Sequence, residues 1–237
     1  LAPTFELMPL SVRAGGLPLK ERVSFSLTPY YLTRALLPSY GDPVIPEHIE
    51  HVAYIGVAGL ALAAVALSFT QNVSHTSQSL VSSLHTRGRQ PVIWLVALGL
   101  FLSLGAYNPF YWLLARYVPG FAHFRVPGRW LALYALGVAA LAGWGTEALW
   151  NRRAHLRWRK VLLATVAFVL AAGWAVVGVR IGEGGYTGWV TVAGWAAAGI
   201  LSMVLIWAAM RAPRLAVIGL VVLLIAELFG ATSTLPH

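Results

Sequence analysis

The chain has 237 residues, of which 58% are hydrophobic and only 11% are charged. Because a soluble domain carries about 25% charged residues, this composition indicates an integral membrane protein. The chain has no cysteine, which excludes disulfides, thiolate nucleophiles and cysteine-ligated metals. We expect its net charge of +9 to reside in loops that flank the membrane, and no binding to nucleic acid.

Residues 1–51 hold seven of the thirteen prolines and no apolar run long enough to cross a bilayer. We expect an extracytoplasmic loop segment that packs on a helical bundle. The residues after Pro29 predict a short amphipathic helix that ends at Pro38. The chain starts without an initiator methionine and ends just after an apolar segment, so we expect it to be part of a longer polypeptide.

Residues 52–230 form the predicted transmembrane domain, which a short tail at 231–237 follows. Helical stretches of sixteen to twenty-two residues reach about 24–33 Å, which is enough to cross a bilayer with little tilt. The sequence therefore predicts an all-α membrane bundle of about six transmembrane helices. The six apolar stretches are 52–70, 92–107, 130–149, 161–179, 189–210 and 215–230.

The stretch at 108–129 interrupts these apolar segments with aromatic and polar residues. Asn108 and Pro109 are a typical helix start, since Asn caps a free amide and Pro suits the first helical position. The helix predicted from Phe110 is too short to span, because Pro119 and Gly120 end it. Its aromatic rings favour a helix that lies at the membrane–water boundary.

The loop at 150–160 holds five basic residues and no acid, which predicts that it faces the cytoplasm. Alternation then puts 71–91 and 211–214 on the same side. The outer side receives 1–51, 108–129, 180–188 and the C-terminus.

Two stripes of small residues predict where helices pack closely, because backbones approach where side chains are small. One stripe lies on the third predicted span and the other on the fifth. Their members are Ala135, Ala139 and Gly143, and then Gly194, Ala198 and Ser202.

Four cationic or titratable side chains gather in the predicted outer segment: Arg116, His123, Arg125 and Arg129. Guanidinium groups pair with phosphate through two parallel hydrogen bonds, so these residues are candidates for binding the phosphate of a lipid carrier. The alternative is that they anchor the span to phospholipid headgroups. Pro127 and Gly128, between the last two arginines, favour a tight turn and hence a shaped site.

Two carboxylates lie within predicted spans, at Glu147 and Glu227. A carboxylate at membrane depth is a functional candidate, but both lie within about a turn of an interface, so we expect structural or snorkelling roles. His48 and His51 are three residues apart and could share a helical face, yet no third ligand accompanies them. We therefore expect no metal site.

Several strings of the chain resemble, in order, the middle of bacterial YfhO-type membrane proteins. They are PTFELMPLSVRAGG at 3–16, LLPSYGDP at 36–43, YIGVAGLALAAVAL at 54–67 and PFYWLLARYVPGFAHFRVPGRWLALYALGVAALAGWG at 109–145. The likeness covers about residues 1–149, and the later spans agree in hydropathy alone. It implies a GT-C-like glycosyltransferase in the bacterial plasma membrane. Such enzymes transfer a sugar from a polyprenyl-phosphate carrier to a cell-envelope acceptor on the outer face.

The resemblance implies that Arg125 and Arg129 bind the carrier phosphate, with Arg116 and His123 in second place. It also implies that Tyr111, Trp112 and Trp130 stack on the sugar or flank the lipid chain. The catalytic base of such enzymes is typically an Asp in the first outer loop. That loop would lie before Leu1, so no residue here inherits this role.

The polyprenyl-linked sugar would be a substrate, and we expect no cofactor. The expected partners are membrane lipids, the polyprenyl-linked sugar and other membrane subunits. The alternative function is a non-catalytic accessory or structural transmembrane subunit of a larger membrane complex.

Overall fold

The computed structural model describes residues 17–42, 51–68, 79–118, 121, 125–151, 158–183 and 187–232, and within them it contains helices and no strand. The predicted all-α bundle is confirmed. Five helices have twenty residues or more: α5 Ser79–Ser103, α7 Leu131–Trp150, α8 Trp158–Glu183, α9 Trp189–Ala208 and α10 Pro213–Thr232. The shorter elements are α2 Leu19–Arg22, α3 Leu32–Leu36, α4 Val57–Ser68, α6 Pro109–Tyr117 and the 3₁₀ turns η3 Gly105–Tyr107 and η5 Pro127–Trp130.

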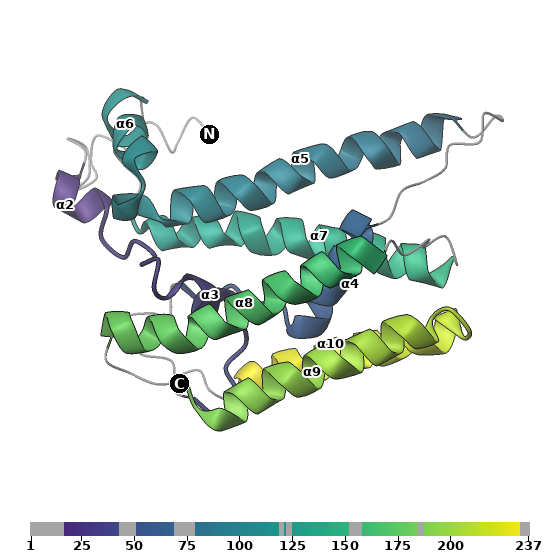
Figure 1. Ribbon diagram of the computed structural model, residues 1–237. Helices are drawn as coiled ribbons and strands as arrows, with labels where there is room; N and C mark the ends of the chain where they lie inside the picture. The colour runs from purple at the N-terminus through teal and green to yellow at the C-terminus, as the bar shows by residue number, and fades with distance from the viewer. Residues whose placement is uncertain are drawn as a thin grey trace.

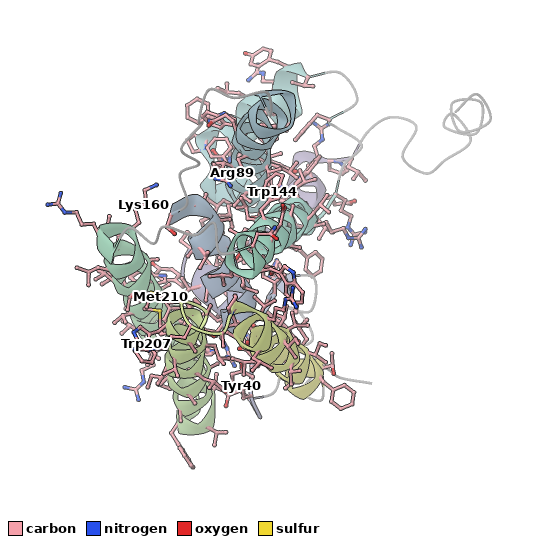
Figure 2. All side chains as sticks on the ribbon, turned by 90° about the vertical axis from the view of Figure 1, so that its right-hand side faces the viewer. Tyr40, Arg89, Trp144, Lys160, Trp207 and Met210 are labelled. Carbon is pink, nitrogen blue, oxygen red and sulfur yellow. The ribbon has the colours of Figure 1, made fainter. Side chains whose placement is uncertain are left out.

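The long helices lie side by side, with α5 beside α7, α9 beside α10, and α8 across the front of the short α4 (Figure 1). One end of the bundle holds α2, α6 and the last turn of α8, and we call it the cap end. The opposite end holds the turn between α9 and α10 at 209–212, and we call it the turn end (Figures 1 and 2).

Among the described residues, four helices are long and apolar enough to cross a membrane, two fewer than the sequence predicted. They are Pro127–Trp150, Leu162–Gly182, Trp189–Ala208 and Pro213–Thr232. Two shorter apolar segments are Val57–Ser68, which is α4, and Arg89–Ser103, which is the C-terminal part of α5. At about 1.5 Å per residue, the twelve residues of α4 reach only about 18 Å, which falls short of the hydrocarbon core of about 30 Å.

The short α4 lies in the interior of the bundle and packs most extensively on α7. Its sequence is apolar on every side, as expected of a helix that other helices surround. Gly145 of α7 allows the closest approach, since a Cβ atom there would clash with the backbone carbonyl of Leu62. The backbones of α4 and α7 are therefore in direct contact.

The two predicted small-residue stripes differ in outcome. On α9, Ala198 and Ser202 are buried and Gly194 faces the ring of Tyr40, so this stripe packs as predicted. On α7, Ala139 is exposed and Gly143 has no neighbour within 4 Å of a built Cβ, so this prediction was wrong. The α7 backbone instead meets its neighbours on the face that carries Gly145, because α4 lies on that side.

Residues 17–42 cross the cap end and attach to several helices by hydrogen bonds to backbone atoms. The amide of Leu27 donates to the carbonyl of Ser103 at 2.9 Å. The indole of Trp174 donates to the Pro29 carbonyl at 2.9 Å, and that of Trp195 donates to the Pro38 carbonyl at 2.7 Å. The helix predicted after Pro29 is present as α3. This segment joins α5, α8 and α9 at one end.

Candidate functional site

The turn that carries Arg125 and Arg129 has a strained backbone. Val126 precedes η5 with φ 63°, in the left-handed region that β-branched residues rarely adopt. Such a conformation costs about 1–3 kcal/mol and persists only where the surrounding structure holds it. Gly128 lies so close to His51 that a Cβ atom would clash with the imidazole ring.

A second strained residue, Phe25, supports the same turn. Its φ is 56°, and its carbonyl accepts hydrogen bonds from the amide of Gly128 at 3.3 Å and from Nε2 of His51 at 2.9 Å. Gly105, with φ 46°, touches Ser26 and Pro127 at the same place. Phe25, Gly105 and Val126 come from separate segments, have left-handed backbone conformations and lie together at this turn.

The predicted arginines lie on the surface around this turn. Arg125 and Arg129 are exposed on either side of the Val126–Gly128 segment, and Arg116 is exposed near the end of α6, 5.7 Å from the ring of Tyr117. In the described part of the chain, no carboxylate lies within ion-pair distance of Arg116 or Arg125. His123 lies outside the described residues.

A row of aromatic rings joins α6 to η5. The ring of Tyr111 meets the edge of Phe121 at 5.3 Å, and Phe121 lies parallel to Trp130 at 6.3 Å. Burial raises the pKa of Tyr111, and a hydrogen bond with Trp130 offsets part of that effect. Phe121 was missed by the sequence reasoning, although it stands in the same string as the arginines.

The three aromatic candidates differ in exposure. Tyr111 is 1% exposed, so it supports the turn from within. Trp112 is 37% exposed and its indole donates to the carbonyl of Ala106 at 3.0 Å. Trp130 is half-buried. The predicted stacking on sugar or lipid therefore rests on Trp112 and Trp130.

The helix of these rings begins where the sequence predicted. The side chain of Asn108 accepts a hydrogen bond from the amide of Phe110 at 3.0 Å, and Pro109 occupies the first helical position. The Nδ2 group of Asn108 also donates to the carbonyl of Phe101 at 2.7 Å, which attaches α6 to the end of α5. One buried side chain thus sets both the start and the direction of α6.

A separate polar cluster surrounds Glu227, which α10 places against the start of α4. Its two carboxylate oxygens accept hydrogen bonds from the amides of Val57 at 2.9 Å and Ala58 at 2.8 Å, and from the hydroxyl of Tyr40 at 2.6 Å. The carboxylate therefore caps the N-terminus of another helix. These hydrogen bonds join α10 to α4 and to the segment 17–42.

Next to this cluster, Arg34 and Asp42 form an ion pair at 3.1 Å, with side chains that are 6% and 17% exposed. Asp42 also accepts from the amide of Gly188 at 3.0 Å, and the Arg34 guanidinium lies 6.0 Å from the ring of Trp195. This pair joins the segment 17–42 to the start of α9. It is therefore part of the bundle's framework rather than of an accessible site.

Glu147 lies in the last turn of α7, toward the turn end of the bundle. It is exposed. Burial lowers the pKa of Arg89 on α5, and the negative charge of Glu147 offsets part of that shift. Within the described residues, no three His, Cys, Asp or Glu side chains come close enough to hold a metal ion. Nε2 of His51 is engaged with Phe25, and His48 lies outside the described residues.

The strained turn with its exposed arginines is the best candidate site in the described part of the chain. It offers cations for an anion and half-buried aromatic rings beside them. Comparisons with protein-family models, with curated proteins and with solved structures found no match to this chain.

Proposed function

We propose that this chain is the membrane-embedded part of a YfhO-like glycosyltransferase of the GT-C type. In this proposal the cap end faces the outer side of the bacterial plasma membrane and binds a polyprenyl-phosphate-linked sugar. The observation that supports it best is the pair Arg125 and Arg129, which a strained turn holds at the surface. Strain of this kind gathers at ligand clamps and active sites, where it fixes a side chain in a working position.

The chemistry suits transfer from a lipid phosphate. As the bond between sugar and phosphate breaks, negative charge grows on the departing phosphate. A positioned cation stabilises that charge most where the dielectric is low, as at a membrane boundary. Arg125 and Arg129 would supply this stabilisation and Arg116 would add to it, while Trp112 and Trp130 would lie against the sugar or the lipid chain.

The test compares Arg125→Gln and Arg129→Gln with Arg180→Gln, which removes an exposed arginine from the last turn of α8. We expect each of the first two variants to lose about 10²-fold in the rate of transfer from the polyprenyl-linked sugar, because loss of one preorganised donor costs about that much. The control should keep its rate. Membrane insertion should be equal in all three, as measured by the amount recovered in washed membranes.

Full transfer by both Arg125→Gln and Arg129→Gln would reject the assignment of the phosphate to this turn. A rate that falls equally in the Arg180→Gln control would show a general effect of surface charge, which also rejects it.

A second candidate function is that of an accessory helix bundle within a larger membrane assembly. It is favoured by α8, of whose apolar span only 17% is buried. Such a surface suits either lipid or a partner helix. A photo-crosslinking side chain at Val169 or Leu170, which are 60% and 68% exposed, distinguishes them. A single discrete adduct of higher mass would favour this second function, and adducts with lipid alone would count against it.

A further inference from the structure

A second surface feature lies at the turn end, where the last turn of α7 meets the start of α10. It is an open hollow with a volume of about 510 Å³, lined by Trp150, Asn151, Ala212, Pro213, Arg214 and Leu215. Pro213 begins α10 directly after the turn at 209–212, which brings the first turn of α10 beside Trp150. The end of α7 and the start of α10, which line the hollow, lie at the turn end, opposite α6 (Figure 1).

The hollow is positively charged and has an aromatic wall. The guanidinium of Arg214 lies 5.9 Å from the ring of Trp150. In the adjoining turn at 209–212, Arg211 lies 4.4 Å from the ring of Trp207 of α9, although it does not line the hollow. The contact between Arg214 and Trp150 leaves the positive charge of the guanidinium in place.

The charge of Arg214 is available to an anion. Among the residues that the structure describes, none supplies a carboxylate within ion-pair distance of Arg214. The carboxylate that precedes Trp150 by one turn, Glu147, acts on Arg89 of α5. An anion that enters the hollow would therefore meet a cation that no carboxylate of the described residues neutralises.

An apolar face continues from the hollow along α10. Leu215, Ile218 and Val222 are 73%, 52% and 59% exposed. Their spacing of three and four residues puts them on one side of the helix. They belong to a helix that is long and apolar enough to cross a membrane, so this face runs from the boundary into the hydrocarbon. A ligand with both an anionic head and a long apolar chain matches the two parts together.

We propose that this hollow binds the phosphate headgroup of an anionic phospholipid, whose acyl chain lies along Leu215, Ile218 and Val222. Basic pockets between membrane helices bind such headgroups, and Trp rings sit at the same depth as the phosphates. A free phosphate ion would use Arg214 but would gain nothing from the apolar face. The proposal does not depend on sugar transfer, because it concerns the other end of the bundle.

The test is native mass spectrometry of the purified protein with equal amounts of phosphatidylglycerol and phosphatidylcholine. We expect the unmodified protein to retain phosphatidylglycerol preferentially. Arg214→Gln should weaken its binding about fivefold, the contribution of one cation at a membrane surface. Arg214→Lys keeps the charge and should keep most of the preference. Arg180→Gln, at the cap end, should behave like the unmodified protein.

Competition with inorganic phosphate distinguishes a bound phospholipid headgroup from a bound phosphate ion. We expect millimolar phosphate to leave the bound phosphatidylglycerol in place, and a phosphate ion that displaces it would overturn the lipid assignment. Equal retention by Arg214→Gln and the unmodified protein would overturn the site itself. The melting temperature in phosphatidylcholine alone checks that Arg214→Gln is folded. If Arg214→Gln is unfolded, Arg214→Lys provides the test. Loss of the preference for phosphatidylglycerol in Arg214→Lys would overturn the role of positive charge.

Discussion

Tyr40 shows how one residue can join distant parts of the bundle. The hydroxyl of Tyr40 donates a hydrogen bond to Glu227 on α10. Its backbone amide donates to the hydroxyl of Thr191 on α9 at 3.2 Å, and its backbone carbonyl accepts from that Thr191 hydroxyl at 2.9 Å. Burial and the neighbouring carboxylate raise the pKa of Tyr40 above its ordinary value. The folded protein therefore favours the neutral phenol.

This shift predicts a loss of stability at high pH. Because the folded pKa of Tyr40 is raised, the stabilisation is complete below the unfolded pKa of about 10 and is lost as the pH rises above it. We expect the melting temperature in detergent to fall above about pH 10, and to fall less steeply in Tyr40→Phe. Tyr54 and Tyr111 are shifted in the same direction, so part of the decline should remain.

At neutral pH, Tyr40→Phe should cost about 1.5–3 kcal/mol, the usual net contribution of one hydrogen bond to a charged group. The amides of Val57 and Ala58 keep their acceptor, so α4 should stay capped. An alkaline decline of equal steepness in both proteins would contradict the role given to Tyr40.

At the scale of the elements, the contact between α4 and α7 depends on one glycine. An alanine at position 145 would place its Cβ against the backbone of Leu62, whereas one at position 143 would meet nothing within 4 Å. The two positions lie on the same helix and differ mainly in what faces them. They form a matched pair for measuring how closely the helices must approach.

We expect Gly145→Ala to lower the stability by about 1–3 kcal/mol, because two backbones must move apart. Gly143→Ala should be neutral, or stabilising by up to about 1 kcal/mol, since alanine favours helix. Thermal unfolding in one detergent measures both variants. Equal destabilisation of the two variants would mean that the close contact between α4 and α7 does not determine the stability.

Most of the helices could be predicted from the sequence. Hydropathy predicted every long helix from α7 to α10, and the pair Asn108–Pro109 predicted the start of α6. Hydropathy does not report which side of an all-apolar helix faces its neighbours, so the stripe at Ala139 and Gly143 was misassigned. It also could not predict that α4 stays short, since the residues before Val57 are apolar too.

The candidate site was predictable in part. The turn between Arg125 and Arg129 could be predicted from the local sequence, since Pro127 and Gly128 favour a turn. The residues beneath that turn, Phe25 and His51, come from a segment more than seventy positions earlier, and no local pattern relates them to it. The cap that Glu227 provides for α4 is likewise a contact between distant segments, and it appears only once the helices are packed.

At the scale of the whole molecule, the chain exposes different chemistry at its two ends. The cap end has exposed aromatic residues on α6, such as Tyr117, and the turn end has Met210 between α9 and α10. If the long helices cross the membrane, these two positions lie on opposite sides. The chain contains no cysteine, so single cysteines can be introduced without background.

We expect a membrane-impermeant maleimide to label Tyr117→Cys in intact cells, and Met210→Cys only after the membrane is opened. These residues are 69% and 51% exposed, so the difference should report sidedness rather than burial. The opposite pattern would reverse the proposed orientation. Labelling of both in intact cells would contradict a bundle that separates the two compartments.

The cap on α4 has a consequence for how the protein is made. The carboxylate that accepts from the Val57 amide is separated from it by 170 positions in the chain. At about 5–20 residues per second, a ribosome needs on the order of ten seconds or more to add that length. During this interval, water or an assembly factor must accept the hydrogen bonds of the first amides of α4. α4 therefore reaches its final state only after α10 has been translated.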